Sequence, residues 1–266
     1  MPRRFTALAC VAALGAAGVA AQSIRPSKEI AAAVASPART PANRERDRYR
    51  HPAETLAFFG VKPTQTVVEF IPSGGWYAEI LAPMVKGRGR YVALVPTTQA
   101  ERTRTMLAGR AAQFGDAQVQ TIDLKTGTST MPAGTADVVL TFRNVHNLLM
   151  RGDEAGAVAV FRGFHAALKP GGVLGVVDHR LPEGMDAARE KTSGYVKRST
   201  VVRIAEAAGF RLAGESPVNA NPRDTHDHPE GVWTLPPTLR LKDVDRAKYE
   251  AIGESDRFTL KFVKPR

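Results

Sequence analysis

Side chains that can bind a small molecule or move a proton follow several short apolar runs of the sequence. They are Glu69 and Ser73, Asp123, the segment 143–147 (RNVHN) and the segment 178–180 (DHR). Apolar runs of this length predict buried parallel strands, and ligands of such sheets bind just beyond the carboxyl ends of the strands. We therefore expect these side chains to gather at one edge of a sheet, where convergent polar groups mark a functional site.

Among these residues, His146 is the first candidate for a general base or a substrate contact, because an unperturbed imidazole titrates near neutral pH. Asn144 is a candidate substrate ligand, and Asp178 begins a second candidate catalytic cluster. Each also has a structural interpretation, as a loop hydrogen bond or as part of a polar network that holds the strand ends. Arg143 is either a clamp for an anionic group or a structural partner of Asp178 or Glu69.

The segment 66–77 (TVVEFIPSGGWY) predicts a strand, a tight turn and the start of a helix. Free N–H groups and the dipole at a helix N-terminus favour anionic or acceptor-rich ligands, so this unit is a candidate cofactor site. A purely structural turn explains the glycines equally well, and an aromatic residue at a helix start is often plain core. The candidate cofactor ligands here are Glu69, Ser73, Gly74, Gly75 and Trp76.

The rest of the chain alternates predicted strands with predicted helices. Strands are expected at 67–71, 90–95, 119–122, 136–142, 173–177, 210–215 and 258–263, and helices at 51–59, 78–82, 98–114, 153–168 and 199–208. This alternation predicts an α/β fold with a mostly parallel, doubly wound sheet and helices on both faces. The long irregular segment 217–237 contains several prolines, and we expect it to cover the site.

The N-terminus predicts a secretory signal peptide over residues 1–21, with a basic start, an apolar run and small residues before the cleavage point. The run is too short for a comfortable membrane span, although an uncleaved anchor is the alternative. Residues 22–42 are expected to form a flexible lead, and residues 43–266 the α/β domain. The protein is therefore expected in the periplasm or outside the cell.

Composition excludes several classes of function. Cys10 is the one cysteine and lies in the signal segment, so the chain after cleavage has no disulfide, thiol catalysis or zinc–thiolate site. Cleavage removes two arginines and no acid, which lowers the formal charge from +11 to +9. The basic residues are scattered, and we expect no nucleic-acid partner. We also expect no metal: the His226-Asp227-His228 segment more simply forms a solvated loop. Ser73 lacks the preceding glycine of a hydrolase nucleophile elbow.

Several motifs occur in an order that resembles a known family. They are the Glu69 strand with its Gly loop, GRYVAL (89–94), ADVVLTFRNVHN (136–147), LKPGGVLGVVDHR (168–180), EAAGF (206–210), VWTLPP (232–237) and IGESDR (252–257). The chain resembles the class I S-adenosylmethionine-dependent methyltransferases, and more closely an exported bacterial group of predicted methyltransferases. The resemblance covers about residues 43–266.

The resemblance implies a seven-stranded sheet with an antiparallel last strand, and transfer of a methyl group to a small molecule. S-adenosylmethionine would be the cofactor, bound by Asp123 and Arg143 in addition to the loop residues, with His146, Asn144 and Asp178 as catalytic residues. The sulfonium is already activated, so such an enzyme mainly holds the acceptor and the methyl group in line.

Two departures from the family pattern leave an alternative open. The positions of the Asp/Glu-x-Gly-x-Gly-x-Gly motif carry Glu69, Ile71, Ser73 and Gly75, so two of its three glycines are replaced. The end of the second strand, 94–97 (LVPT), has no acid for the ribose hydroxyls. The alternative is an exported, non-catalytic binding protein with a degenerate cofactor site, in which Ile71, Val95 and Pro96 fill the place of the adenosyl group.

Overall fold

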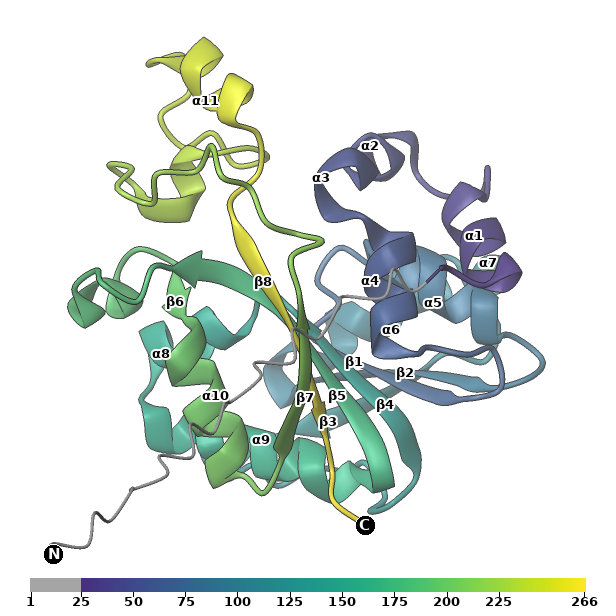
Figure 1. Ribbon diagram of the computed structural model, residues 1–266. Coiled ribbons are helices and arrows are strands. Elements are labelled where there is room, and N and C mark those ends of the chain that lie inside the picture. Colours follow the sequence, from purple (N-terminus) through teal and green to yellow (C-terminus); the bar gives the residue numbers. More distant parts are fainter. Residues whose placement is uncertain (1–24) are drawn as a thin grey trace, which may run out of the picture.

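The computed structural model describes residues 25–266, which form a mixed β-sheet with helices on both faces (Figure 1). The predicted signal peptide lies outside the described residues. The strands are β1 (Thr66–Phe70), β2 (Arg90–Pro96), β3 (Gln118–Ile122), β4 (Ala136–Phe142), β5 (Leu168–Leu181), β6 (Val196–Lys197), β7 (Arg211–Ser216) and β8 (Arg257–Val263). The described elements contain no helix that is long and apolar enough to cross a membrane.

The sheet has the strand order β3-β2-β1-β4-β5-β8-β7. Neighbours from β3 to β5 are parallel, whereas β8 runs antiparallel to both β5 and β7. The predicted mostly parallel sheet with an antiparallel last strand is therefore confirmed. The sequence did not indicate β6, which pairs with the end of β5 through two residue pairs, Arg180 with Val196 and Leu181 with Lys197.

The helices cover the sheet in two layers. They are α1 (Lys28–Ala35), α2 (Pro41–Arg44), α3 (Asp47–Arg50), α4 (Pro52–Phe59), α5 (Ala78–Val85), α6 (Ala100–Ala108), α7 (Ala111–Phe114), α8 (Val145–Arg151), α9 (Glu154–Ala167), α10 (Arg198–Ala207) and α11 (Arg246–Ile252). Because successive side chains of a strand point to opposite faces, Val67 packs with α1, α4 and α5, and Val68 packs with α8, α9 and α10. The predicted helix at 98–114 is interrupted at Gly109, which ends α6.

The segment predicted to be a flexible lead, residues 22–42, contains α1 and the start of α2 in its described part, so this expectation does not hold there. Ser27 caps α1 by accepting a hydrogen bond from the N–H of Ile30, whose side chain is buried against the core. Arg39 is almost fully buried and donates to Asp47 at 2.6 and 2.8 Å. One apolar anchor and one charged pair thus hold a segment whose composition carries little apolar signal.

The segment 217–256, between β7 and β8, forms a cap beyond the carboxyl ends of β4 and β5 (upper part of Figure 1). It contains the short helix η3 (Gly231–Thr234) and α11. Asp224 holds the cap together, because its carboxylate accepts hydrogen bonds from the hydroxyl of Tyr195, the ring of His228 and the N–H of Asp256. The cap therefore has a fixed shape over the edge of the sheet where the candidate residues lie.

Candidate functional site

A cavity of about 200 Å3 lies between the cap and the carboxyl ends of β4 and β5. The turn from β4 into α8 contributes most of its polar wall, His179 comes from β5, and the cap closes the other side. The lining residues are Ser73, Phe142, Arg143, Asn144, His146, Asn147, His179, Val232, Trp233, Pro236, Pro237, Thr238, Glu254 and Ser255. Part of the predicted set of polar side chains therefore gathers at this cavity. The segment 217–237 helps to cover the cavity, as expected.

A second, larger cavity of about 560 Å3 lies beyond the ends of β1, β2 and β3. Its lining residues are Ile71, Gln99, Leu124, Lys125, Asn144, Asn147, Leu148, Arg151, Gly152, Asp153, Ala155 and Gly156. Asn144 and Asn147 line both cavities. The loop after β1 likewise contributes Ile71 to the larger cavity and Ser73 to the smaller one, so the two cavities are neighbours across this loop.

The loop after β1 keeps a glycine-type backbone where two of its glycines are replaced. Ile71, Ser73 and Gly75 have φ values of 50°, 54° and 82°, a region that residues with a Cβ rarely adopt. For a β-branched residue such as Ile71 this conformation stores strain, and strain of this kind concentrates at functional sites. The replacement of the glycines therefore changes the side chains of the loop while its path remains that of a glycine loop.

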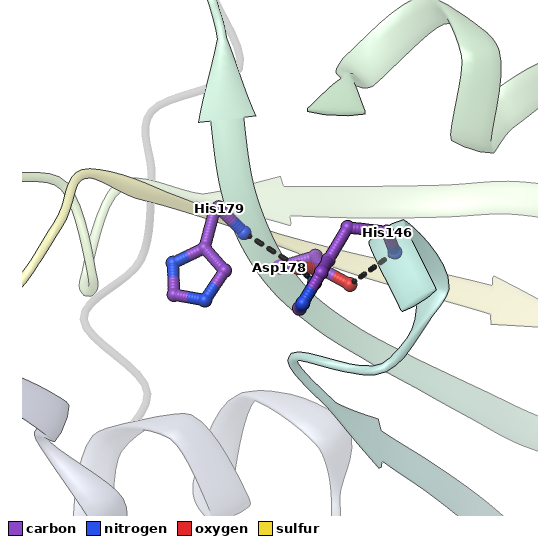
Figure 2. Close-up of side chains that lie close together, drawn as sticks. All are labelled: His146, Asp178 and His179. Carbon is purple, nitrogen blue, oxygen red and sulfur yellow. Dashed lines mark hydrogen bonds and ion pairs between the residues drawn. The ribbon is translucent and has the colours of Figure 1, made fainter. Parts of the chain in front are cut away.

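Asp178 connects β5 to the start of α8 (Figure 2). Its Oδ2 accepts the N–H groups of Val145 at 2.7 Å and His146 at 3.3 Å, which places a carboxylate at the N-terminus of the helix. Its Oδ1 lies 2.7 Å from Nδ1 of His146 and accepts the N–H of His179 at 2.8 Å. All three residues are buried. A buried carboxylate in this position holds His146 with Nδ1 protonated and leaves Nε2 as the basic nitrogen.

His179 is held in a different way. Its Nδ1 lies 2.5 Å from the hydroxyl oxygen of Ser255 in the cap, and its ring packs edge-on against His146. Burial, together with the nearby His146 and Arg143, lowers the pKa of His179 well below its ordinary value, so this ring is neutral at physiological pH. The cavity thus contains a neutral imidazole beside one that is paired with a carboxylate.

The group His146, Asp178 and His179 also brings metal-ligating atoms within 4.8 Å of one another. The carboxylate of Asp178, however, already accepts three backbone N–H groups and the ring of His146. A metal ion would have to displace these hydrogen bonds. The geometry therefore fits a histidine oriented by an aspartate better than a metal centre.

Asn144 and Arg143 occupy the turn between β4 and α8. The amide of Asn144 donates to the carbonyl of Phe70 at 2.9 Å, so it joins the ends of β4 and β1, and its oxygen has no hydrogen-bond partner among the described residues. Arg143 has a φ of 60°, and its N–H donates to the carbonyl of Val177 at 2.7 Å. Its guanidinium forms no hydrogen bond or ion pair within residues 25–266, neither with Asp178 nor with Glu69.

Five of the predicted cofactor ligands, Glu69, Gly74, Gly75, Trp76 and Asp123, line neither cavity. Glu69 is buried and accepts the hydroxyl of Tyr91 at 2.7 Å; burial raises its pKa to about 7, although this hydrogen bond lowers it. Trp76 is also buried, and its indole donates to the carbonyl of Asn43. Asp123 is exposed, and its Oδ1 accepts the N–H groups of residues 125 and 126 in its own turn. These side chains support the fold around the loop, and Gly74 lies on the surface of that loop.

The histidines of the 226–228 segment face different carboxylates. His228 lies 2.9 Å from Asp224, and His226 lies 3.4 Å from Asp256. Although burial lowers the pKa of His226, the hydrogen bond to Asp256 and the charge of Asp224 raise it above its ordinary value overall. The segment is therefore part of the structure of the cap.

Sequence reasoning missed several residues of the two cavities. Trp233 and Ser255 were noted only within motifs, and their place in the smaller cavity follows from the fold of the cap. Gln99, Leu124 and Leu148 belong to the larger cavity and carry no local signal, since each is an ordinary residue of a helix or turn. A systematic inspection of the first residues after each strand would have found Leu124.

No known family model matches this sequence, and no curated protein is similar to it. Solved structures share its fold. A SAM-dependent methyltransferase from Aquifex aeolicus has a TM-score of 0.56 and 15% identity, covering 85% of this chain and 94% of the other. A putative sarcosine dimethylglycine methyltransferase from Galdieria sulphuraria has a TM-score of 0.55 and 14% identity, covering 84% and 85%.

The [4+2]-cyclase SpnF is equally similar, with a TM-score of 0.57 and 14% identity over 84% of this chain and 81% of the other. The structural neighbours are thus class I SAM-dependent methyltransferases and a protein named as a cyclase. At these identities the similarity shows the class I methyltransferase-like α/β fold. Function has to be argued from the site, because one fold carries many activities.

Proposed function

We propose that this protein is an S-adenosylmethionine-dependent methyltransferase that acts on a small molecule. The cofactor binds in the larger cavity and the methyl acceptor in the smaller one. The observation that carries the proposal is the pair of cavities that share Asn144 and Asn147, separated by a loop with glycine-type backbone angles. This arrangement places a cofactor-sized space directly beside a polar space with a basic histidine.

The larger cavity suits the cofactor in size and in lining. Its volume of about 560 Å3 lies within the roughly 300–1,000 Å3 typical of small-molecule sites. Leu124 and Leu148 offer apolar contacts to the adenine. Gln99, just after β2, offers an amide to the ribose hydroxyls in place of the acid that the family uses. When bound there, the cofactor supplies a methyl group activated by the sulfonium charge.

The chain itself holds the acceptor and takes its proton. Asp178 keeps Nδ1 of His146 protonated, which leaves Nε2 free to accept a proton from a hydroxyl or amine in the smaller cavity. Asn144 is fixed by its bond to the carbonyl of Phe70, and its free oxygen can accept a hydrogen bond from either ligand. The cap covers these groups on one side of the cavity.

The alternative is a non-catalytic binding protein of the same fold. It is favoured by the side chain of Ile71, which lines the larger cavity, and by the absence of an acid at the end of β2. Val95 and Pro96, which were expected to fill this space together with Ile71, are buried and do not line the cavity. The remaining volume therefore argues for the methyltransferase.

Calorimetric titration of residues 22–266 with S-adenosylmethionine and S-adenosylhomocysteine tests the proposal. We expect micromolar dissociation constants for the intact chain. Ala155→Trp should abolish binding, because Ala155 is exposed at the start of α9 and faces the larger cavity. Ala111→Trp is the matched control, since this exposed alanine lines neither cavity.

The absence of binding at millimolar ligand, in a sample that unfolds cooperatively, would reject the methyltransferase and leave the binding protein. Equal loss of affinity in both tryptophan variants would show that the effect is unrelated to the cavity, and would also count against the proposal.

We also propose that the protein is exported, on the strength of residues 1–21 alone. Expression of the full chain in a bacterium, followed by N-terminal sequencing of the periplasmic fraction, is the test. A mature protein that begins at Gln22 supports export, and an intact N-terminus in the cytoplasm contradicts it.

A further inference from the structure

Arg143 brings to the smaller cavity a positive charge that has no hydrogen-bonded partner among the described residues. Its side chain is partly buried and lines the cavity, and within the described residues the guanidinium has no hydrogen-bond acceptor. Burial lowers its pKa to about 10, so the group remains charged at neutral pH. Removing a charge from water is costly unless the charge is paired. The partly buried guanidinium therefore lowers the stability of the folded protein, and a bound anion would offset this loss.

The nearby carboxylate of Glu254 is already occupied by other arginines. Its Oε1 accepts Nε of Arg46 at 2.8 Å, and its Oε2 accepts Nε of Arg50 at 2.9 Å and Nη1 of Arg257 at 3.1 Å. Three guanidinium groups thus share one carboxylate before Arg143 is counted. Although Glu254 reaches the cavity wall, the region as a whole has an excess of positive charge.

Two guanidinium nitrogens of this group lack hydrogen-bond partners in the part of the chain that the structure describes. Nη2 of Arg46 and Nη2 of Arg50 are buried and form no hydrogen bond, and Arg50 as a residue is only 3% exposed. The gap between Arg50, Arg143 and Arg257 has a volume of about 10 Å3, which holds about one water molecule and no carboxylate. Among the described residues, the smaller cavity is therefore the space from which an anion can reach Arg143, and the charges of the other arginines add to the attraction.

Part of the lining of the smaller cavity is apolar. Trp233, Val232 and Pro237 come from the cap, and Phe142 comes from the end of β4. We propose that the smaller cavity binds a small acid, in which an anionic oxygen group (carboxylate or phosphate) contacts Arg143 and an apolar body packs against Trp233. Guanidinium groups bind both kinds of anion through two parallel hydrogen bonds.

If the smaller cavity holds the methyl acceptor, as proposed above, the acceptor is an acid. The binding itself can be tested without the cofactor, so its failure and the failure of the methyltransferase proposal are separate results. Binding of S-adenosylmethionine reports on the larger cavity, and binding of acids reports on the smaller one.

The experiment compares benzoate, its neutral analogue benzamide, and phenyl phosphate. The chain has two tryptophans, so a 1H–15N spectrum contains two indole signals. Trp233 lines the cavity, whereas the indole of Trp76 is bonded to the carbonyl of Asn43 and serves as an internal reference. The signals are assigned with Trp233→Phe. We expect at least one of the two anions to shift the Trp233 signal with a dissociation constant at least tenfold lower than that of benzamide.

The anion with the lower dissociation constant identifies the preferred group. Equal affinity for benzamide and both anions in the intact chain would overturn the proposal without any variant. Arg143→Gln should abolish the preference for the anion, while Arg203→Gln, which removes an exposed arginine paired with Glu154, should keep it.

Stability provides a second readout. Without ligand, Arg143→Gln should unfold at a temperature about 2–4 °C higher, because an unpaired charge is removed from a partly buried site. A lower unfolding temperature together with an unchanged preference for the anion would give Arg143 a structural role and overturn the proposal.

Discussion

The strained loop after β1 predicts that glycine at position 71 is more stable than alanine, which is the reverse of the usual order. Ile71 has a φ of 50° and lies at a position where the family pattern has glycine. We expect Ile71→Gly to be more stable than Ile71→Ala. At most positions glycine is less stable than alanine by about 0.5–1 kcal/mol, because glycine loses more backbone freedom on folding.

The expected difference in unfolding free energy follows from comparing the two variants. Both remove the packing of the half-buried Ile71 side chain against the core, so that loss is shared by the two proteins. Alanine retains a Cβ in the left-handed region, which costs roughly 1–2 kcal/mol. Glycine relieves this strain and loses about 0.5–1 kcal/mol of backbone entropy. The glycine variant should therefore be the more stable by up to about 1.5 kcal/mol.

Urea unfolding followed by circular dichroism measures the difference from the midpoints, provided that the slopes agree. The control is Ala32→Gly in the middle of α1, an exposed helical position where we expect a loss of about 0.5–1 kcal/mol. Ile71→Gly also removes a side chain from the wall of the larger cavity. It should therefore bind S-adenosylmethionine at least as tightly as the original chain.

An alanine variant that is more stable than the glycine variant would refute the reasoning. It would mean that the backbone at this position has negative φ in solution, and that the loop is not a glycine-type loop. The argument for a cofactor site beside this loop would then lose its main structural support.

Three further changes should have measurable effects. Asp178→Asn should cost at least about 2 kcal/mol in urea unfolding, because its amide NH2 would face buried donors, and NMR should show loss of the Nδ1-protonated form of His146. Glu69 has its pKa raised from 4.5 to about 7. Its folded form therefore binds a proton more tightly, and the stability it contributes, present below pH 4.5, is lost as the pH rises through 7. Between pH 5 and 8, the unfolding free energy of the original chain should fall by up to roughly 3 kcal/mol relative to that of Glu69→Gln. Gly231→Ala should lower the stability measured by thermal unfolding by at least about 2 kcal/mol, because the added Cβ would lie 2.0 Å from the carbonyl oxygen of Ser193. The same change should weaken the binding of acids.

Each of these results has a clear contrary outcome. An Asp178→Asn protein with normal stability would mean that the carboxylate does not hold the start of α8. Parallel pH profiles for the original chain and Glu69→Gln would place the carboxyl group in contact with water. A Gly231→Ala protein with unchanged stability would mean that the cap does not pack on residue 193 as described.

Much of the sheet could be predicted from the sequence because its strands are buried on both faces. The runs 91–95 (YVALV) and 138–140 (VVL) are continuous and apolar, which is typical of such strands, and the structure places strands at Arg90–Pro96 and Ala136–Phe142. Parallel connections then bring the strand ends to one edge. The proximity of His146 and Asp178 follows from that rule, although they are far apart in the sequence.

The division of roles within the site could not be predicted, because it depends on the direction of each side chain. Glu69 and Asp123 follow the same strand-end rule, yet one turns into the core toward Tyr91 and the other binds its own turn. The ordered segment around α1 was missed because its burial depends on Ile30 and Arg39 rather than on a periodic apolar face.

The sequence determined the α/β class and the edge of the sheet at which polar residues collect. These properties follow from apolar periodicity and from turn residues, which act over a few neighbouring positions. The tertiary structure decided that the cap closes over His146 and His179, that the Arg143 guanidinium has no hydrogen-bond partner within residues 25–266, and that the loop at Ile71 keeps a glycine-type path. These properties depend on contacts between segments that are well separated in the sequence, and no local pattern encodes such contacts.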